Sequence, residues 1–124
     1  MISAVIIDDD KNITDVFSEY LTLEGIEVIG KGYDGKDAVD LYAKLNPDVM
    51  FLDVMMERFD GLYALEEIRK INTDANVIMI TADLTENTYK KMTSLKASAI
   101  IFKPYEIDAL RKIIKNLVQV TQKI

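Results

Sequence analysis

The chain has 124 residues, the size of one domain, and 49% of them are hydrophobic, which is enough to bury a core without disulfides. It contains no cysteine and no histidine, which excludes a disulfide framework, thiolate chemistry and the usual zinc ligands, so that any bound metal must be a hard ion held by oxygen. The net charge of -6 repels nucleic acid and anionic membranes.

Five short apolar runs alternate with five stretches whose apolar residues recur at helical spacing. Most of the runs are rich in Val, Ile and Phe without polar alternation, as in parallel strands buried on both faces. In chain order, the sequence predicts strand 4–7, helix 12–24, strand 26–29, helix 35–45, strand 49–52, helix 61–71, strand 77–80, helix 85–95, strand 99–102 and helix 106–122. This alternation predicts an α/β domain over residues 1–124 with a doubly wound, five-stranded parallel sheet and helices on both faces.

Several of these elements carry further signals. The run 26–29 contains Glu27 and is followed by Gly30, which suits an edge strand. The helix 85–95 has few apolar residues, so we expect it to pack loosely. The helix 12–24 has an apolar stripe made of Ile13, Val16, Phe17, Tyr20 and Leu21. The last helix has a broader stripe made of Ile107, Leu110, Ile113, Ile114, Leu117 and Val118.

Polar residues follow four of the predicted strands, at the point where each strand ends. They are Asp8, Asp9, Asp10, Asp53, Thr81 and Lys103. The carboxyl ends of parallel strands meet at one edge of the sheet, where such folds bind their ligands. Each residue alone has an ordinary explanation; Asp10, for example, can cap the helix that follows it.

Together, the carboxylates make a stronger case for a bound cation. Two carboxylates about 4 Å apart repel each other by about 4 kcal/mol at an effective dielectric constant of 20. A helix cap, worth about 1 kcal/mol, does not offset this repulsion. The cations that could neutralise the cluster are Lys103 and a hard divalent ion, of which Mg²⁺ (or Mn²⁺) fits best.

A site of this composition suits phosphoryl transfer. The -3 charge of Asp8, Asp9 and Asp53 is balanced by the +3 of Mg²⁺ and Lys103, and the balanced site can bind an incoming anion. A metal ion, an ammonium group and a hydroxyl placed around a phosphoryl group lower the barrier to its transfer. Asp53 stands alone after an apolar strand, which makes it the best candidate for a carboxylate nucleophile that forms an acyl phosphate.

The sequence resembles the receiver domains of two-component response regulators, including the single-domain chemotaxis type. The resemblance spans essentially the whole chain. It rests on four motifs in order: Val5-Ile6-Ile7-Asp8-Asp9-Asp10; Phe51-Leu52-Asp53-Val54-Met55-Met56 with Asp60-Gly61; Ile78-Met79-Ile80-Thr81-Ala82; and Phe102-Lys103-Pro104-Tyr105. The resemblance implies a flavodoxin-like (βα)5 fold with strand order 2-1-3-4-5. In this family the corresponding Lys-Pro peptide bond is often cis, so the resemblance also implies a cis bond between Lys103 and Pro104.

The same resemblance assigns roles to the strand-end residues. Asp53 corresponds to the phosphoacceptor, and Asp8 and Asp9 to the acidic pair that holds Mg²⁺ together with Asp53 and the Met55 carbonyl. Thr81 and Lys103 correspond to the residues that contact the phosphoryl oxygens. The implied function is acceptance of a phosphoryl group from a phosphohistidine, a switch of an interaction surface and slow self-dephosphorylation, without enzymatic turnover.

The chain departs from the family pattern at two positions. Glu57 replaces a usual proline, which makes the loop beside the site more charged. Ile100 replaces a usual Tyr or Phe, and we expect Phe102 to be a poor substitute because it projects to the opposite side of the strand.

Two more positions bear on the lifetime of the acyl phosphate. Met55 and Asp83 flank the path of an attacking water in the family. A thioether orients water poorly and a carboxylate can only accept hydrogen bonds, so we expect a moderately long-lived acyl phosphate.

Three other functions are alternatives to this interpretation. A haloacid-dehalogenase-type phosphatase shares the strand-end aspartate and the Asp8-x-Asp10 spacing, but generally has a larger core and a cap. A flavodoxin-like cofactor binder would need a phosphate-binding loop where this chain has three aspartates. A degenerate receiver that acts only as an interaction module is the third; the complete set of site residues speaks against it.

The expected partners are proteins. The resemblance implies a sensor histidine kinase or a histidine phosphotransfer protein as donor, and a downstream target that docks on the fourth helix, fifth strand and fifth helix. Tyr89 and Tyr105 are candidate contacts there. No apolar run exceeds four residues, so we expect a cytoplasmic protein without membrane contact. We prefer a free-standing protein to the receiver part of a longer regulator, because nothing basic or linker-like follows Gln122.

Overall fold

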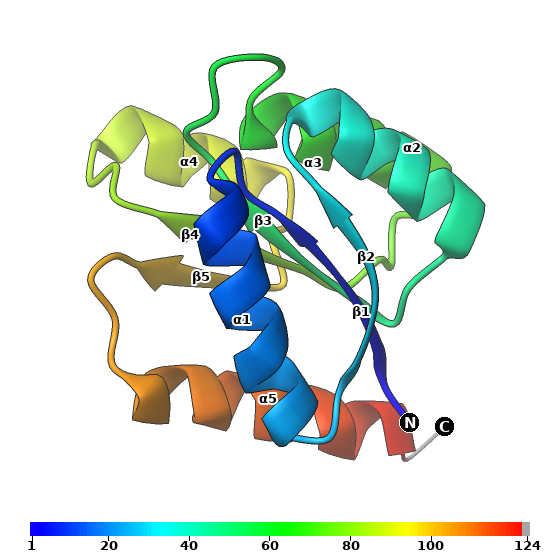
Figure 1. Cartoon of the computed structure of the whole chain (residues 1–124). Helices are drawn as coiled ribbons and strands as arrows, with labels where there is room; N and C mark the ends of the chain where they lie inside the picture. Colours follow the sequence, from blue (N-terminus) through cyan, green and yellow to red (C-terminus); the bar gives the residue numbers. More distant parts are fainter. Residues whose placement is uncertain (123–124) are drawn as a thin grey trace.

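The structure is a computed structural model that describes the backbone of residues 1–122 and the side chains up to residue 116. It alternates strands and helices as the sequence predicts (Figure 1). The elements are β1 (Ser3–Ile7), α1 (Lys11–Leu23), β2 (Glu27–Gly32), α2 (Gly35–Leu45), β3 (Val49–Asp53), α3 (Gly61–Ile71), β4 (Val77–Thr81), α4 (Glu86–Ser94), β5 (Ala99–Phe102) and α5 (Ile107–Gln122). The side chains of Leu117 and Val118, predicted for the last apolar stripe, lie outside the described residues.

The five strands form one parallel sheet in the order β2-β1-β3-β4-β5, which confirms the predicted fold. β2 and β5 are the edges, so the edge position predicted for the second strand is correct. In the register of the sheet, Asp53 pairs with Ile80, and Thr81 pairs with Phe102. The ends of β1, β3, β4 and β5 therefore lie along one rim.

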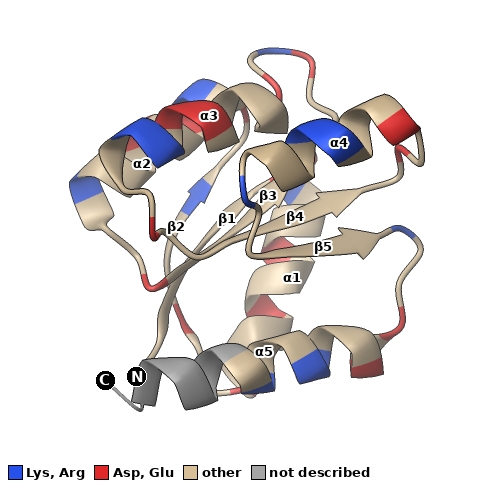
Figure 2. Cartoon of the chain, turned by 180° about the vertical axis from the view of Figure 1, so that it is seen from behind, with Lys and Arg blue, Asp and Glu red and all other residues tan. Residues whose placement is uncertain are grey.

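Two apolar layers cover the sheet, because successive side chains of each strand point to opposite faces. One layer joins Val5, Met50 and Met79 to residues of α2, α3 and α4. The other joins Ile6 and Phe51 to residues of α1 and α5. Figures 1 and 2 show the same arrangement, with charged residues mainly on the helices and in the loops. Both faces of the sheet are thus covered by apolar side chains, as the apolar runs predict.

Side-chain caps fix where the first four helices begin. The carboxylates of Asp10, Asp34 and Asp60 accept hydrogen bonds from backbone N–H groups in the first turns of α1, α2 and α3. Thr85 does the same for α4. Each cap satisfies one of the N–H groups that a helix leaves without a partner. The capping role considered for Asp10 is thereby confirmed.

Two sequence predictions need correction. β2 runs through Gly30 to Gly32 and does not end at residue 29, because its pairing with β1 continues past a register shift to Gly32. Along α1, Val16 is 67% exposed and Ile13 is 42% exposed, although both were predicted on the buried stripe. They lie beside an apolar groove between α1 and α5 that also involves Ile107, so only part of the stripe reaches the core.

Arg69 of α3 holds the turn between α4 and β5. Its guanidinium donates hydrogen bonds to the carbonyl oxygens of Leu95, Ala75 and Lys96 at 3.0, 2.8 and 2.7 Å. Partial burial lowers the pKa of this guanidinium, while Tyr42 and Asp74 oppose the shift. The C-terminal end of α4 is thus attached to α3 by a charged donor.

In the described part of the chain, no helix is long and apolar enough to cross a bilayer.

Candidate functional site

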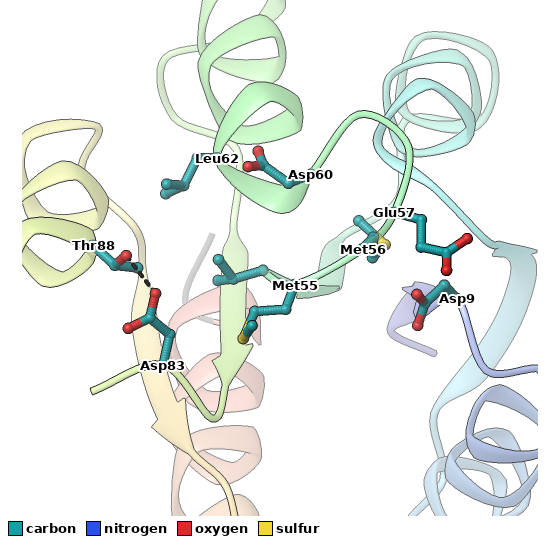
Figure 3. Close-up of a pocket in the computed structure, with 9 residues that line it drawn as sticks. Asp9, Met55, Met56, Glu57, Asp60, Leu62, Asp83 and Thr88 are labelled. Carbon is teal, nitrogen blue, oxygen red and sulfur yellow. Dashed lines mark hydrogen bonds between the residues drawn. The ribbon is translucent and has the colours of Figure 1, made fainter. Parts of the chain in front are cut away.

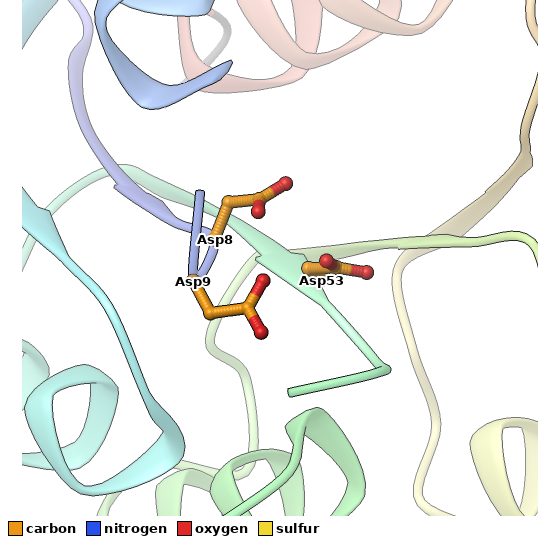
Figure 4. Close-up of side chains that lie close together, drawn as sticks. All are labelled: Asp8, Asp9 and Asp53. Atoms are coloured by element: carbon orange, nitrogen blue, oxygen red, sulfur yellow. The ribbon is translucent and has the colours of Figure 1, made fainter. Parts of the chain in front are cut away.

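Three carboxylates meet at the rim formed by the ends of β1 and β3 (Figure 4). Oxygen atoms of Asp8, Asp9 and Asp53 all lie within 4.8 Å of one another. Asp8 and Asp53 are each only 6% exposed, whereas Asp9 is exposed. The structure therefore brings together the three carboxylates among the four predicted metal-ligating residues.

The backbone orients the two buried carboxylates. Asp8 Oδ1 accepts a hydrogen bond from the Asp10 N–H at 2.9 Å. Asp53 Oδ1 accepts a longer one from the Met55 N–H at 3.4 Å. In both cases the second oxygen, Oδ2, remains for a cation. Three carboxylates with different burial form the oxygen-only donor set that suits Mg²⁺.

Lys103, directly after β5, places a cationic group against this cluster. Its Nζ lies 3.6 Å from Asp8 Oδ2 and 3.6 Å from Asp53 Oδ2. The peptide bond between Lys103 and Pro104 is cis, as the family resemblance predicts. One ammonium group thus lies beside two buried carboxylates. A dication in addition to this ammonium group would balance the three negative charges of the cluster.

Burial raises the pKa of Asp53 to about 6. Lys103 opposes this shift, while the neighbouring charges of Asp8 and Asp9 add to it. Burial also raises the pKa of Tyr105, and the charge of Asp8 adds to that shift. The raised pKa of Asp53 means that, without a metal ion, its ionised carboxylate is less stable in this site than it is in water.

Thr81 ends β4 and is fully buried. Its hydroxyl oxygen accepts a hydrogen bond from the Asp83 N–H at 2.9 Å. It directly follows Ile80, the residue that pairs with Asp53 in the sheet. Thr81 therefore lies on the predicted rim, one residue beyond the strand pair that carries Asp53.

A hollow of about 480 Å³ opens beside the carboxylates (Figure 3). Asp9, Met55 and Asp83 are among its lining residues. Met55 is 59% exposed, so its thioether faces solvent at this hollow. Hydrogen bonds from Thr88 and Thr85 hold the pKa of Asp83 below its usual range. Both residues predicted to influence water access thus border the same hollow.

The position of Phe102 corrects a prediction. Ile100 packs on the apolar layer that contains Met92 of α4, and the ring of Phe102 stacks on Tyr89 of α4 with centroids 6.5 Å apart. Ile100 and Phe102 therefore lie on the same side of β5, because residues two apart in a strand share a face. The prediction that Phe102 projects to the opposite side is wrong.

Close backbone contacts hold the loop between β3 and α3 beside the site. A side chain at Gly61 would place its Cβ 2.3 Å from the Asp53 carbonyl oxygen, and one at Gly35 would place it 2.1 Å from the Phe59 carbonyl oxygen. The Gly61 N–H donates to the Val54 carbonyl oxygen at 2.9 Å. Glu57, in the middle of this loop, is exposed. The glycine of the Asp60-Gly61 motif is thus explained by packing against the strand that ends in Asp53.

Sequence reasoning missed Thr88. Its hydroxyl donates to Asp83 Oδ2 at 2.7 Å, and Thr88 is one of the two buried residues of α4 (Figure 3). The available signal was the spacing of Asp83, Thr85 and Thr88 around a helix start, where such residues cap the first turn. Arg69 was also missed, since nothing in its sequence context distinguishes it from a surface arginine.

The sequence model of the response regulator receiver domain matches residues 4–115. The chain is 30% identical over 121 residues to the probable C4-dicarboxylate response regulator DctR of Bacillus subtilis, covering 97% of this chain and 54% of DctR. It is 31% identical over 115 residues to the regulatory protein AtoC of Escherichia coli, covering 93% of this chain and 25% of AtoC. The chain thus spans about half or less of these two curated relatives.

A solved structure gives the same result. The CheX-CheY-BeF3-Mg²⁺ complex of Borrelia burgdorferi contains a chain that superimposes with a TM-score of 0.87 at 28% identity, covering 94% of this chain and 89% of that chain. The parallel sheet, its strand order and the sequence match agree. The chain belongs to the response regulator receiver domain family, whose members are phosphoacceptors in two-component signalling.

Proposed function

We propose that residues 1–124 form a receiver domain in which Asp53 accepts a phosphoryl group, and that Asp8, Asp9, Asp53 and the Met55 carbonyl hold Mg²⁺ or Mn²⁺. One observation supports this most strongly: three carboxylates lie within 4.8 Å of one another and an ammonium group lies 3.6 Å from two of them. Such a cluster is unfavourable on its own and is relieved by a dication.

In the proposed reaction, an oxygen of the Asp53 carboxylate attacks phosphorus. A P–O bond to Asp53 forms while the P–N bond to the donor histidine breaks, and the imidazole leaves with the electron pair of that bond. Lys103 and the Thr81 hydroxyl then neutralise and hold the phosphoryl oxygens. The bound metal supplies further charge neutralisation. Water later hydrolyses the acyl phosphate and restores Asp53, so the domain is a switch rather than a turnover enzyme.

We further propose protein partners on both sides of this reaction. The donor is the phosphohistidine of a sensor kinase or of a histidine phosphotransfer protein, and the target docks on α4, β5 and α5. The stacked and exposed pair of Tyr89 and Phe102 supports this docking face, because exposed aromatic residues are typical of interaction surfaces.

The intact mass of the protein after incubation with acetyl phosphate tests the assignment. Wild type should gain the mass of one PO₃ group in the presence of Mg²⁺ and not in the presence of EDTA. Asp53→Asn should gain none, while Asp10→Asn, which removes a neighbouring carboxylate but keeps a good helix cap, should still gain it. No mass gain in wild type would favour a degenerate receiver that acts only as an interaction module.

The phosphatase alternative predicts a different pattern. Turnover of p-nitrophenyl phosphate would be lost in Asp8→Asn and retained in Asp53→Asn. In this structure the second aspartate of the Asp8-x-Asp10 spacing caps α1 through a hydrogen bond from the Asn12 N–H at 2.9 Å. It has its own structural role, which weakens the resemblance to that enzyme class.

A further inference from the structure

Asp83 joins the end of β4 to the first turn of α4 through hydrogen bonds. Its backbone N–H donates to Thr81 Oγ1 at 2.9 Å. Its carboxylate accepts from the Thr85 N–H at 2.8 Å and from the Thr88 hydroxyl at 2.7 Å (Figure 3). The Thr85 hydroxyl in turn donates to Thr88 Oγ1 at 3.1 Å. A continuous path of hydrogen bonds therefore connects a site residue to a helix.

The rest of α4 is attached differently. Its two buried residues are Thr88 in the first turns and Met92 near the end. Arg69 binds the carbonyl oxygens of Leu95 and Lys96 just beyond the C-terminal end. The C-terminal end is thus fixed to α3, whereas the first turns are held by the Thr88–Asp83 hydrogen bond and by the stack of Tyr89 on Phe102 of β5.

The path starts at a hydroxyl that the proposed function also uses, because Thr81 Oγ1 accepts from the Asp83 N–H and can donate its own hydrogen to a phosphoryl oxygen. A Thr81 hydroxyl that turns to donate to a phosphoryl oxygen also moves the oxygen to which the Asp83 N–H donates. The N–H must follow or lose its partner, and the loss of a partner by a shielded polar group is costly. Because the Asp83 carboxylate is bonded to Thr88, a shift of Asp83 is transmitted to the first turn of α4.

We propose that Asp83 and Thr88 are positioning residues that couple occupancy of Asp53 to the position of the first turn of α4. The coupling rests on the proposed function and adds a route by which the site acts on one specific helix. Neither side chain belongs to the proposed metal ligands or to the proposed phosphoryl contacts. The Asp83–Thr88 hydrogen bond is the link whose removal should separate binding at the site from the response of α4.

Backbone amide NMR spectra recorded with beryllofluoride and Mg²⁺, a mimic of the acyl phosphate, test this coupling. Thr88→Val removes the hydroxyl and keeps the shape and branching of the side chain. Thr88→Ser restores the hydroxyl. Thr93→Val is a matched control on the same helix, because within the described part of the chain the Thr93 hydroxyl bonds only to the Tyr89 and Lys90 carbonyl oxygens of α4. If Thr88→Val does not fold, Thr88→Ala removes the same donor.

In wild type, saturation should shift the amide signals of Glu86–Ser94. In Thr88→Val the midpoint of the titration should stay within about twofold, while the α4 shifts become at least about threefold smaller. Thr88→Ser and Thr93→Val should behave as wild type. Wild-type α4 shifts in Thr88→Val, an equal loss in Thr93→Val, or loss of beryllofluoride binding in Thr88→Val would overturn the coupling. No binding in wild type would instead overturn the proposed function, and the coupling with it.

Discussion

Asp53 lies beside Asp8, and each of these buried carboxylates has an oxygen 3.6 Å from the same Lys103 ammonium group. One positive charge is thus shared by two negative charges in a place with little water. Burial accordingly raises the pKa of Asp53 to about 6, although Lys103 lowers it. In the absence of metal, the ionised Asp53 carboxylate destabilises the fold at neutral pH.

The first prediction concerns the stability of the metal-free protein. The pKa of Asp53 is 3.8 in the unfolded chain and about 6 in the folded one, so the folded state binds more protons between these values. The free-energy cost of keeping Asp53 ionised in the folded protein is therefore fully present above pH 6 and disappears as the pH falls towards 4. Asp53→Asn should therefore raise the free energy of unfolding at pH 7.5 in EDTA by up to about 2 to 3 kcal/mol.

Urea denaturation at several pH values measures this effect. The difference between Asp53→Asn and wild type should shrink as the pH is lowered from 7.5 to 4.5. Asp10→Asn serves as the control, because Asp10 is exposed and asparagine caps a helix as well as aspartate does. A difference that stays constant over this pH range would contradict the raised pKa of Asp53.

The second prediction concerns metal binding. Mg²⁺ at about ten times its dissociation constant should stabilise wild type by about 1.4 kcal/mol, because it binds only the folded state. Asp9→Asn should lose most of this gain, since it removes an exposed carboxylate of the cluster and leaves both buried ones. Thermal unfolding with increasing Mg²⁺ measures the gain. An unchanged gain in Asp9→Asn would exclude Asp9 as a ligand.

The fold was predictable because its signals are local. The apolar runs that became β1, β3, β4 and β5 have no polar alternation, and two helices, Gly35–Leu45 and Gly61–Ile71, have the predicted bounds. Where prediction failed, non-local packing decided. Val16 shares the helical stripe with Phe17, yet of these two only Phe17 reaches the core, because Val16 lies at the open groove between α1 and α5.

The site was predictable for a related reason. The residues of the acidic cluster follow strands, and parallel strands end at one rim, so sequence order alone brings Asp8 and Asp53 together. No such rule predicts side-chain hydrogen bonds across a loop. The bond from Thr88 to Asp83 and those from Arg69 to distant carbonyl oxygens depend on rotamers and on the path of the chain. They therefore became visible only in the structure.

The third prediction concerns Arg69. Replacing it by Gln should lower the free energy of unfolding by about 2 to 4 kcal/mol, because carbonyl oxygens that now accept from a charged donor lose their partner. Lys70→Gln is the matched control on the next residue, since Lys70 is exposed and its ion pair with Glu67 lies at the surface. Urea denaturation compares the two variants. Equal effects would show that the guanidinium bonds contribute nothing specific.

The fourth prediction concerns the lifetime of the acyl phosphate. Met55 is exposed at the hollow beside the carboxylates, and a thioether cannot orient an attacking water. Met55→Asn provides an amide that both donates and accepts, and should speed hydrolysis by roughly threefold to tenfold. Met55→Leu should leave the rate unchanged. Loss of the phosphorylated mass over time, after the phosphodonor is removed, gives the rates; an asparagine variant no faster than wild type would refute the argument.

The fifth prediction concerns Gly61, whose packing positions the end of β3. A Cβ there would clash with the Asp53 carbonyl oxygen and would lie 2.8 Å from Val54 Cα, so Gly61→Ala must move the backbone that carries Asp53. We expect about 2 to 4 kcal/mol of destabilisation. We also expect phosphorylation by acetyl phosphate at least about tenfold slower in the folded fraction, because small displacements of a nucleophile are costly.

Gly30→Ala is the control for this substitution. The three atoms nearest to its Cβ would belong to side chains and not to the backbone, the nearest being Leu45 Cδ1 at 3.1 Å, so a small shift of that side chain accommodates it. It should keep wild-type phosphorylation. A Gly61→Ala protein that is folded and phosphorylated as fast as the Gly30→Ala protein would show that the close approach to Asp53 does not position the carboxylate. The glycine would then serve only the turn into α3, where the Asp60 side chain already fixes the first residue of the helix.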